Sequence, residues 1–408
     1  MTRIGFAYNQ KPEDSPLIGN QATAHATMVD DGELPRPEED PPSQSSDEFA
    51  EWDSKETIDA VARALSALGE VIRLEANEDF PEILRDARPD IVFNIAEGRH
   101  GVNREAHVPA ICEFYGIPYS GSDPLTLSLC LDKARAKEVF AYHGIPTPRF
   151  FVVRDMADFV ARASGTPSLP LPLFVKPIHE GSSKGITERN FCRTAAELEA
   201  QVAFLLETYG QPVIVEEYLP GAEFTCAVLG NGTTAKVLPI VGMNFESLPD
   251  GALPIYGFEA KWIWDRPERP LKMFDCPADI DAALAGAIER VTLDAYAALG
   301  CRDWSRIDVR LDARGEPNLV EVNPLPGILP DPADNSCFPK AARAAGMSYD
   351  ELIQTCLKLA AARRDVPIER QLKKVRTVRM AASTPRTPRL REVDGPAAED
   401  SVSNRLTA

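Results

Sequence analysis

Apolar and polar positions alternate with two different periods through the first third of the chain. Short apolar runs at residues 3–8, 70–74 and 90–95 have the length and composition of strands. Between the first two runs, the spacing of an amphipathic helix joins Ile58, Val61, Ala62, Leu65 and Leu68. Asp53 and Glu56 predict a capping box at the start of this helix. Strands that alternate with helices predict β-α-β units around a parallel sheet.

A different pattern begins after Gly121. Residues 131–143 predict a helix that Gly144 ends, and the prolines within residues 146–148 mark a boundary. A strand, a helix and a further strand are then expected at residues 173–177, 194–209 and 213–219. Two strand pairs are expected at residues 223–229 with 235–240 and within 306–323, and two helices at 278–299 and 348–364.

These elements predict three domains that combine the α/β and α+β classes. Residues 1–122 are expected to form a Rossmann-like domain, residues 123–219 a small α+β domain and residues 220–364 a larger α+β domain. Residues 10–46 are rich in Pro, Glu and Ser and predict a mobile loop, while residues 365–408 predict a disordered tail.

Composition narrows the class of function. The chain has 408 residues, of which 44% are hydrophobic and 26% charged, as in ordinary globular proteins. A formal charge of −18 disfavours nucleic acid as a partner and favours small-molecule chemistry. No apolar run approaches the length of a membrane span or signal sequence, so we expect a cytoplasmic protein with no membrane partner. The eight cysteines form no C-x-x-C pair, which disfavours a structural zinc site.

The hairpin at residues 306–327 carries polar residues where a buried sheet would use apolar ones. Side chains two apart on a strand share a face, so Arg306 lies with Asp308, and Glu321 with Asn323. Folding back at the turn brings Asp308 near Glu321 and Asn323. Three oxygen donors suit Mg²⁺, which binds a few carboxylates together with phosphate and water oxygens. The alternative is an ordinary solvated face of an antiparallel sheet.

Lysines and a glycine–serine loop favour a phosphate ligand. Lys176 ends an apolar strand that leads into residues 179–186, where backbone N–H groups and serine hydroxyls are suited to phosphate oxygens. Lys133 begins another helix and is alternatively a solvated surface lysine. Metal ligands, the loop and the spaced lysines together favour chemistry on ATP, although no G-x-x-x-x-G-K-[ST] sequence is present.

In combination, these stretches resemble the ATP-grasp superfamily, and within it the D-alanine–D-alanine ligases, from about residue 90 to residue 364. The matching stretches, in order, are residues 92–98, 117–122, 132–133, 174–185, 215–219, 223–225, 258–261, 306–308 and 321–327. Their order and spacing are far more specific than any single stretch. The resemblance implies an ATP-grasp fold after a Rossmann-like domain, with ATP between the second and third domains.

The resemblance implies roles for individual residues at the nucleotide. Lys133 and Lys176 would be the lysines on the phosphate and adenine sides of ATP, and Glu223 would hold the ribose hydroxyls. The hinge that reads the adenine edge would consist of Glu216, Glu217, Tyr218 and Leu219. Residues 181–185 would close over the phosphates, with Ser182 and Ser183 as donors.

The resemblance also implies a reaction centre. Asp308, Glu321 and Asn323 would bind two magnesium (or manganese) ions. The tetrahedral intermediate would be stabilised by Arg306 and the Gly327 amide. Two residues from closing loops would complete the catalytic set, namely Ser182 and Lys261.

The chain departs from the ligase pattern where amino acids would bind. The family's glycine pair and glutamate after the first strand are absent, so the ammonium of the first substrate would need Glu13, Asp14 or Glu51. Trp262 replaces the tyrosine expected after Lys261, and residues 98–106 are altered. Extra residues separate Gly327 from Ser336, whose hydroxyl would bind the carboxylate of the second substrate.

The sequence therefore predicts an ATP-dependent carboxylate–amine ligase that joins amino acids or similar molecules through an acyl phosphate. The altered substrate positions favour amino-acid conjugation in specialised metabolism over D-alanyl-D-alanine synthesis. Two alternatives remain open at this point: a phosphotransferase and a non-catalytic nucleotide-binding module. Family members often form homodimers, and the resemblance extends that expectation to this chain.

Overall fold

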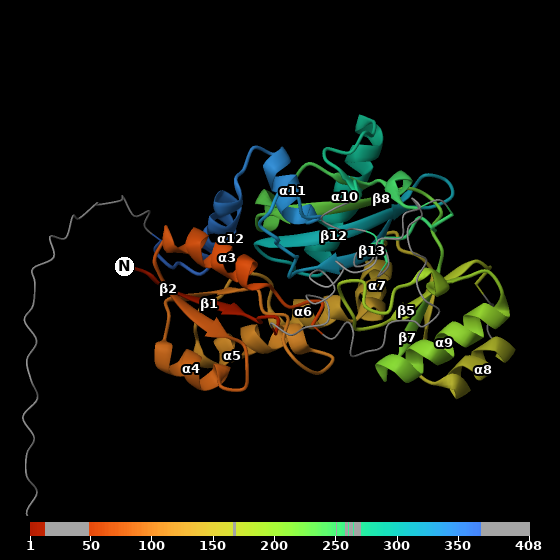
Figure 1. Ribbon diagram of the computed structural model, residues 1–408, viewed down its shortest axis with the longest axis horizontal. Coiled ribbons are helices and arrows are strands. Elements are labelled where there is room, and N and C mark those ends of the chain that lie inside the picture. Colours follow the sequence, from red (N-terminus) through yellow and green to blue (C-terminus); the bar gives the residue numbers. More distant parts are fainter. Residues whose placement is uncertain are drawn as a thin grey trace, which may run out of the picture. The chain divides into compact units, whose positions relative to one another are not determined.

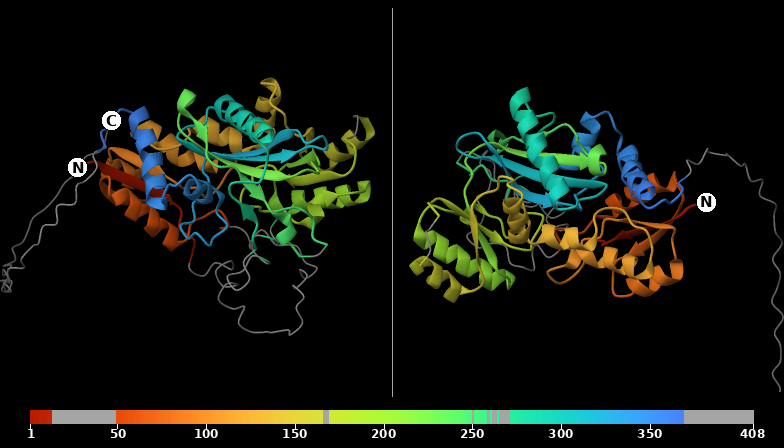
Figure 2. Two further views of the ribbon diagram at one scale, coloured as in Figure 1. Left: turned by 90° about the horizontal axis from the view of Figure 1, so that it is seen from above. Right: turned by 180° about the vertical axis from the view of Figure 1, so that it is seen from behind.

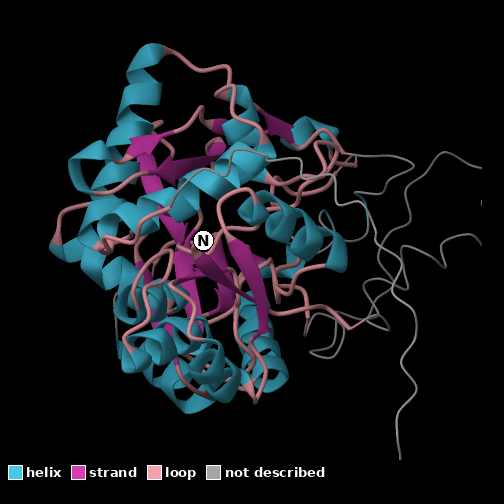
Figure 3. Cartoon of the chain, turned by 90° about the vertical axis from the view of Figure 1, so that its left-hand side faces the viewer, coloured by secondary structure: helices cyan, strands magenta, loops and turns pink. Residues whose placement is uncertain are grey.

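The computed structural model describes residues 1–12, 49–165, 169–249, 251–257, 260, 264 and 271–368. Within these residues the strands form three sheets, which helices cover (Figures 1 and 3). Most of the predicted loop at residues 10–46, and of the predicted tail at 365–408, lies outside the described residues. None of the helices in the described part of the chain combines the length and hydropathy that a membrane span requires.

The first sheet is parallel and has the order β2-β1-β3. Its strands are β1 (Arg3–Tyr8), β2 (Glu70–Glu75) and β3 (Ile91–Asn94), and its helices are α3 (Lys55–Ser66), α4 (Phe80–Ala87) and α5 (His107–Tyr115). Because side chains alternate along a strand, β1 buries Ile4 and Phe6 on the side of α3, and Ala7 on the side of α4 and α5. The predicted parallel arrangement of the amino-terminal part is confirmed.

The amino end of α3 differs from the predicted capping box. The helix cap is Ser54, whose hydroxyl oxygen accepts the Thr57 N–H at 3.3 Å. Asp53 instead pairs its backbone with the segment after β1, donating to the Asn9 carbonyl at 3.0 Å and accepting from the Lys11 N–H at 2.9 Å. The prediction that Asp53 caps the helix is therefore wrong, because its backbone belongs to an extended stretch.

The second sheet is antiparallel and has the order β4-β7-β5-β6. Its strands are β4 (Phe150–Val153), β5 (Leu173–Pro177), β6 (Phe191–Cys192) and β7 (Val213–Glu217). Helices α8 (Met156–Gly165) and α9 (Ala195–Tyr209) pack on one face of this sheet (Figure 1). On the other face, Ala134 of α7 (Lys133–Tyr142) packs against Ile178 and Ile214.

Asp132 sets the start of α7. Its carboxylate accepts the N–H groups of Ala134 and Arg135, each at 3.0 Å, and so caps the helix. A separate helix, α6 (Pro124–Leu131), ends just before it. The helix predicted at residues 131–143 therefore begins at Lys133, which places this lysine in the first turn.

The third sheet has the order β11-β10-β8-β12-β13, and β9 pairs with β8. Its strands are β8 (Glu223–Leu229), β9 (Lys236–Val237), β10 (Val241–Met243), β11 (Phe274–Asp275), β12 (Trp304–Leu311) and β13 (Pro317–Asn323). Alternation along β8 places Cys226 and Val228 against α10 (Ala282–Ala298), and Ala227 and Leu229 against α11 (Cys337–Ala344). Both predicted strand pairs are confirmed, although β9 is shorter than predicted.

The last helix, α12 (Tyr349–Arg363), returns to the amino-terminal part and lies beside α3 (Figure 2). Short 3₁₀ helices occupy Arg104–Ala106, Glu188–Asn190, Gly232–Thr234 and Phe245–Ser247. Each sheet falls within one of the three predicted domain ranges. The boundaries at residues 122, 219 and 364 stay predictions, since Met1–Gln371 form one compact unit.

Asp303 joins distant parts of this unit. Its carboxylate is fully buried and accepts from the Gly121 N–H at 2.8 Å, from Asn231 Nδ2 at 2.8 Å and from Arg363 Nη2 at 2.8 Å. Arg363 also donates to the Tyr119 and Gly121 carbonyls at 3.3 and 3.1 Å. The carboxylate therefore connects the end of α12 to the segment after the first sheet and to the start of β12.

Replacing Asp303 with alanine is expected to lower the free energy of unfolding by about 3–5 kcal/mol, because the largely buried Arg363 would lose its charged partner and the Gly121 N–H its acceptor. Urea denaturation measures this loss. Asp59→Ala is the control, since it removes a half-exposed ion pair with Arg73 at 2.5 Å and should cost about 0–1 kcal/mol. Equal losses in the two variants would contradict the role given to Asp303.

Candidate active site

A cavity of about 860 Å³ lies among the three sheets. Its walls include Glu97 from the amino-terminal part, Lys176 from the second sheet and Asp308 from the third. Cavities of this volume are typical of sites for small molecules and cofactors. The site residues predicted from the sequence that line it are Lys133, Lys176, Ser182, Ser183, Glu216, Glu217, Tyr218, Leu219, Glu223, Arg306, Asp308, Glu321, Asn323, Gly327 and Ser336.

The register of β12 and β13 brings together the residues predicted to bind metal. Asp308 lies opposite Glu321, and Arg306 lies opposite Asn323. Arg306 Nη2 donates to Asp308 Oδ2 at 3.0 Å, and Thr225 Oγ1 on β8 donates to Asp308 Oδ1 at 2.7 Å. With the Asn323 amide turned over, its oxygen accepts from Arg306 at 2.9 Å and its nitrogen donates to Glu321 at 3.2 Å. The hairpin thus places two carboxylates and an amide oxygen on one wall.

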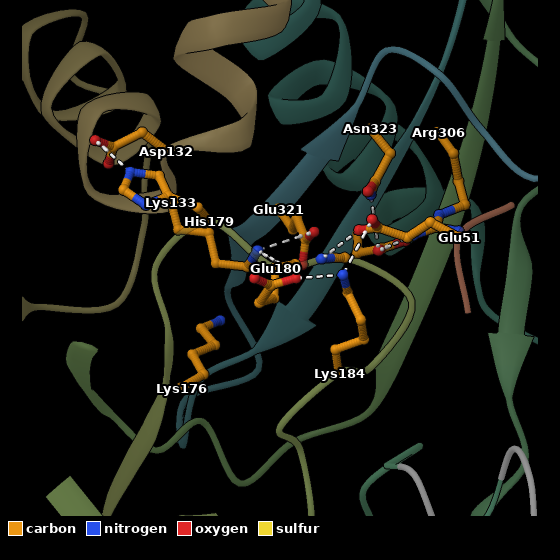
Figure 4. Close-up of polar contacts among 12 residues, drawn as sticks. Glu51, Asp132, Lys133, Lys176, His179, Glu180, Lys184, Arg306, Glu321 and Asn323 are labelled. Atoms are coloured by element: carbon orange, nitrogen blue, oxygen red, sulfur yellow. Dashed lines mark hydrogen bonds and ion pairs between the residues drawn. The ribbon is translucent and has the colours of Figure 1, made fainter. Parts of the chain in front are cut away.

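Buried lysines balance the carboxylates of this wall and of the hinge, and Figure 4 shows Lys133 paired with Glu321. Lys133 Nζ lies 3.5 Å from Glu321 Oε1, and Lys176 Nζ lies 2.7 Å from Glu216 Oε2. Lys137 Nζ lies 2.8 Å from the other oxygen of Glu216. Burial by itself raises the pKa of Glu216, but the two ammonium groups outweigh it and the pKa is lowered. Both lysines thereby fix the carboxylate in its ionised form.

Lys137, which the sequence analysis did not single out, supports the site from behind the cavity wall by pairing with Glu216. It is fully buried, and Nζ also donates to Thr147 Oγ1 at 2.9 Å. Burial lowers the pKa of Lys137 to about 8, against the attraction of Glu216. Its spacing of one helical turn from Lys133 was the available signal, because residues four apart share a helix face.

Arg310 is a second missed residue. Its Nη1 donates to Glu223 Oε2 at 2.8 Å and its Nη2 donates to Tyr218 Oη at 3.0 Å. Burial raises the pKa of Glu223, and Arg310 opposes the rise. On β12 the residue continues the series Arg306, Asp308, Arg310 on one face, so strand alternation alone could have identified it. It fixes Tyr218 of the predicted nucleotide hinge and Glu223, the residue predicted to hold the ribose.

The loop after β5 approaches the same wall. Ser182 and Ser183 both have positive φ angles, 50° and 62°, in the left-handed region that residues with side chains seldom adopt. Ser183 Oγ donates to the Tyr256 carbonyl at 3.1 Å. Lys133 Nζ donates to the Glu180 carbonyl, which connects the loop to the phosphate-side lysine. Strain of this kind is common in segments that clamp ligands.

The predicted second-substrate residues lie next to each other. Ser336 Oγ donates to the Gly327 carbonyl at 3.2 Å and accepts the Leu329 N–H at 3.2 Å. The extra residues between Gly327 and Ser336 therefore form a loop that returns to its own start. Both residues line the same cavity as Arg306.

Carboxylates crowd the part of the cavity nearest the amino-terminal sheet. Burial, together with Glu51, raises the pKa of Glu105 to about 8, and burial raises the pKa of Asp53 to about 7. Burial and Glu105 also raise the pKa of Glu97. Burial would raise the pKa of Glu51 as well, but Lys184 and Arg104 together lower it to about 2. The sequence analysis missed Glu97, Glu105 and Asp53 as cavity residues.

Of the three acids considered for the first ammonium, only Glu51 can be placed. Its carboxylate is already bound by Arg104 and Lys184. Glu13 and Asp14 lie outside the described residues, as do Lys261 and Trp262. In the part of the chain that the structure describes, no cluster of three or more His, Cys, Asp or Glu side chains is arranged to hold a metal.

Sequence comparisons find the same family of proteins that the motifs suggested. The family described as D-ala D-ala ligase C-terminus matches residues 139–358. The uncharacterized protein y4sG of Sinorhizobium fredii is 35% identical over 318 residues, which are 76% of this chain and 88% of that protein. The D-alanine–D-alanine ligase of Bordetella petrii is 37% identical over 273 residues, which are 67% of this chain and 76% of that enzyme.

Solved structures show the same fold. The D-alanine–D-alanine ligase from Bacillus anthracis superimposes with a TM-score of 0.61 at 23% identity, and its complex with ATP with a TM-score of 0.58 at 22% identity. Each superposition covers 90% of this chain and 99% of the other. Together with the match over residues 139–358, the relatives establish that the chain belongs to the D-alanine–D-alanine ligase family of the ATP-grasp superfamily and is an ATP-dependent carboxylate–amine ligase.

Proposed function

We propose that this enzyme phosphorylates the carboxylate of one amino-acid-like substrate with ATP and joins it to the amine of a second. The observation that carries the proposal is the arrangement of one cavity wall. Lys133, which pairs with Glu321, and Lys176 line the same cavity as the carboxylates Asp308 and Glu321 of this wall. Phosphoryl transfer depends on such neutralisation and positioning of negative oxygens.

ATP would lie between the second and third sheets. The Glu216–Leu219 stretch would contact the adenine, Glu223 the ribose hydroxyls, and the loop with Ser182 and Ser183 the phosphates. Lys133 and Lys176 would bind phosphate oxygens, because both ammonium groups reach the cavity from buried stems. The family resemblance assigns the transferred phosphate to Lys261, which lies outside the described residues.

The donor set fits magnesium. Asp308, Glu321 and Asn323 supply hard oxygen donors from one hairpin, and Mg²⁺ typically takes one or two carboxylates together with substrate phosphates. Two carboxylates and an amide leave room for such phosphate and water ligands. A bound ion would neutralise phosphate charge and help align the reacting oxygens. We propose these three residues as its ligands.

The remaining residues suit the second half of the reaction. A carboxylate is a poor electrophile, and conversion to an acyl phosphate provides a good leaving group. Attack by the amine then creates an oxyanion, for which Arg306 and the Gly327 N–H would be the donors. Ser336 lies beside Gly327 and would hold the carboxylate of the attacking substrate.

The acidic end of the cavity supports substrates that carry an ammonium group. Glu97 and Glu105 line the cavity and repel each other electrostatically. A cationic amine between them would relieve this repulsion. D-alanine is one candidate, because relatives bear the name D-alanine–D-alanine ligase. The acids in this region differ from those of the family pattern, which favours a substrate other than D-alanine.

The expected state of the enzyme is a homodimer in the cytoplasm.

The test of the proposal is an amino-acid panel. Purified enzyme with MgATP is offered D- and L-amino acids singly and in pairs, and ADP and the ligated product are quantified together. One ADP is expected per peptide-like bond formed. ADP without any ligated product across the whole panel would instead favour a phosphotransferase or an ATPase.

Replacing Glu321 with glutamine is expected to lower kcat for product formation by roughly 100-fold or more. The reason is that this proposed metal ligand, which also pairs with Lys133, loses its charge. Steady-state ADP release measures the effect. Glu316→Gln is the matched control, because this glutamate is exposed in the turn of the same hairpin. Retention of full activity by Glu321→Gln would rule out the assigned role.

Activity should also depend on pH through the acidic end. A carboxylate binds an ammonium only when it is ionised, and Glu105 with a pKa of about 8 and Asp53 with a pKa of about 7 lose their protons as the pH rises. We therefore expect kcat/KM for the amino substrate to increase between about pH 6 and 8. Glu105→Gln should flatten the upper part of this rise, while Glu82→Gln, an exposed change on α4, should preserve it. A profile unchanged in Glu105→Gln would refute the assignment.

A further inference from the structure

Glu51 connects the amino-terminal part of the chain to the loop at residues 179–185. Its Oε1 accepts the Gly181 N–H at 2.9 Å, and its Oε2 lies 3.2 Å from Lys184 Nζ. Residues 51 and 181 are far apart in sequence, so this contact exists only in the folded chain. Its side chain is only 7% exposed. This buried carboxylate therefore anchors the backbone of the loop and is not a solvent-exposed surface group.

Arg104 completes the contact from the same side. Its Nη2 donates to Glu51 Oε1 at 2.7 Å and Oε2 at 2.9 Å, and its Nε donates to Oε2 at 3.3 Å. Its Nη1 donates to the His179 carbonyl at 2.9 Å. The guanidinium thus orients the carboxylate and also binds the first residue of the loop directly. Multidentate pairing of this type gives geometric precision as well as attraction.

Further polar contacts hold Lys184 and Glu180 of the loop in place. Lys184 Nζ also pairs with Glu180 Oε2, and Gln211 Nε2 donates to Glu180 Oε1 at 2.7 Å. A methyl group added at Gly181 would lie 2.6 Å from Glu51 Oε1. Glycine at this position is therefore what allows the carboxylate to reach the loop backbone.

The contacts lie next to the phosphate end of the cavity. Lys133, which pairs with Glu321, also donates to the Glu180 carbonyl. Figure 4 shows Glu51, Lys184 and Glu180 grouped beside Lys133 and Glu321. A shift of the loop would therefore displace the lysine that neutralises the reaction centre.

We propose that Glu51 and Arg104 are positioning residues that latch the 179–185 loop over the reacting phosphoryl group. This inference rests on the proposed function, because it concerns the loop that covers the phosphates in that reaction. The latch keeps water from the acyl phosphate, so that its bond to phosphate is broken by the amine and not by hydrolysis. Glu51 is then a structural anchor of the loop, and the ammonium of the first substrate must use other acids.

The first test compares wild-type enzyme with Glu51→Gln and Arg104→Gln in MgATP and the amino-acid pair that gives most ligated product with the wild type in the panel. Both variants should lower kcat/KM by about 10- to 100-fold, as expected for a misplaced reacting group. They should also form less dipeptide per ADP than the wild type, since water competes once the loop opens. Glu51→Asp, which keeps the charge, should recover part of this ratio.

Hydrogen exchange of residues 178–187 gives a readout without substrate. The Gly181 amide should exchange faster in Glu51→Gln, because its acceptor is weakened. Arg73→Gln is the control: it removes an exposed ion pair from the same part of the chain and should change neither exchange nor coupling. Folded Glu51 and Arg104 variants with wild-type exchange and a wild-type product-to-ADP ratio would overturn the latch.

Gly181→Ala tests the latch from the loop side, with every charged group retained. The added methyl group should push the Glu51 carboxylate away and lower the product-to-ADP ratio, even if the other two variants fold poorly. An unchanged ratio would overturn the inference. A wild-type enzyme that makes ADP but no ligated product with any amino acid refutes the proposed function itself, whereas the exchange measurement still reports on the loop contact.

Discussion

Charge pairing inside one cavity is the constraint on which this structure depends. A carboxylate removed from water is costly unless a cation stands beside it. Glu216 meets this need with Lys137 and Lys176, and Glu321 with Lys133. The cations and carboxylates come from different elements, so each pair also holds those elements together. Two of these lysines, Lys133 and Lys176, also line the cavity.

The sheets provide the precision that this pairing requires. Antiparallel register on β12 and β13 fixes Asp308 opposite Glu321, and the neighbouring strand β8 adds the hydroxyl of Thr225. Alternation along the same strands buries Ile307 and Val309 against α10 on the opposite face. A slip of one residue would exchange the polar and apolar faces, so packing of the core and geometry of the site are specified together.

The family resemblance predicted the residues on the hinge, loop and hairpin side of the cavity better than those nearest the amino-terminal sheet. Along the hinge, the loop and the hairpin, the motifs that suggested the family correspond to residues that line one cavity. Near the amino-terminal sheet, Asn9 follows β1 and serves structure: it donates to the Ala76 carbonyl at 3.0 Å and accepts the Gly98 N–H at 2.8 Å. Acids from later segments, Glu97 and Glu105, take the places that face the cavity. The cavity residues that match the family's motifs and the acids near the amino-terminal sheet therefore come from separate parts of the chain.

The sequence by itself determined the parallel arrangement of the amino-terminal strands, the two strand pairs of the third sheet, the shared face of Asp308 and Arg306, and the motifs that place the chain in its family. The spacing of hydrophobic residues within each segment contains this information, because it indicates which side of the helix or strand is buried. Only the tertiary structure decided that Ser54 and not Asp53 caps α3, that Glu51 binds the Gly181 amide, and that Lys137 meets Glu216. Which buried cation meets which buried carboxylate depends on distances between segments far apart in the chain, and no spacing within a single segment encodes those distances.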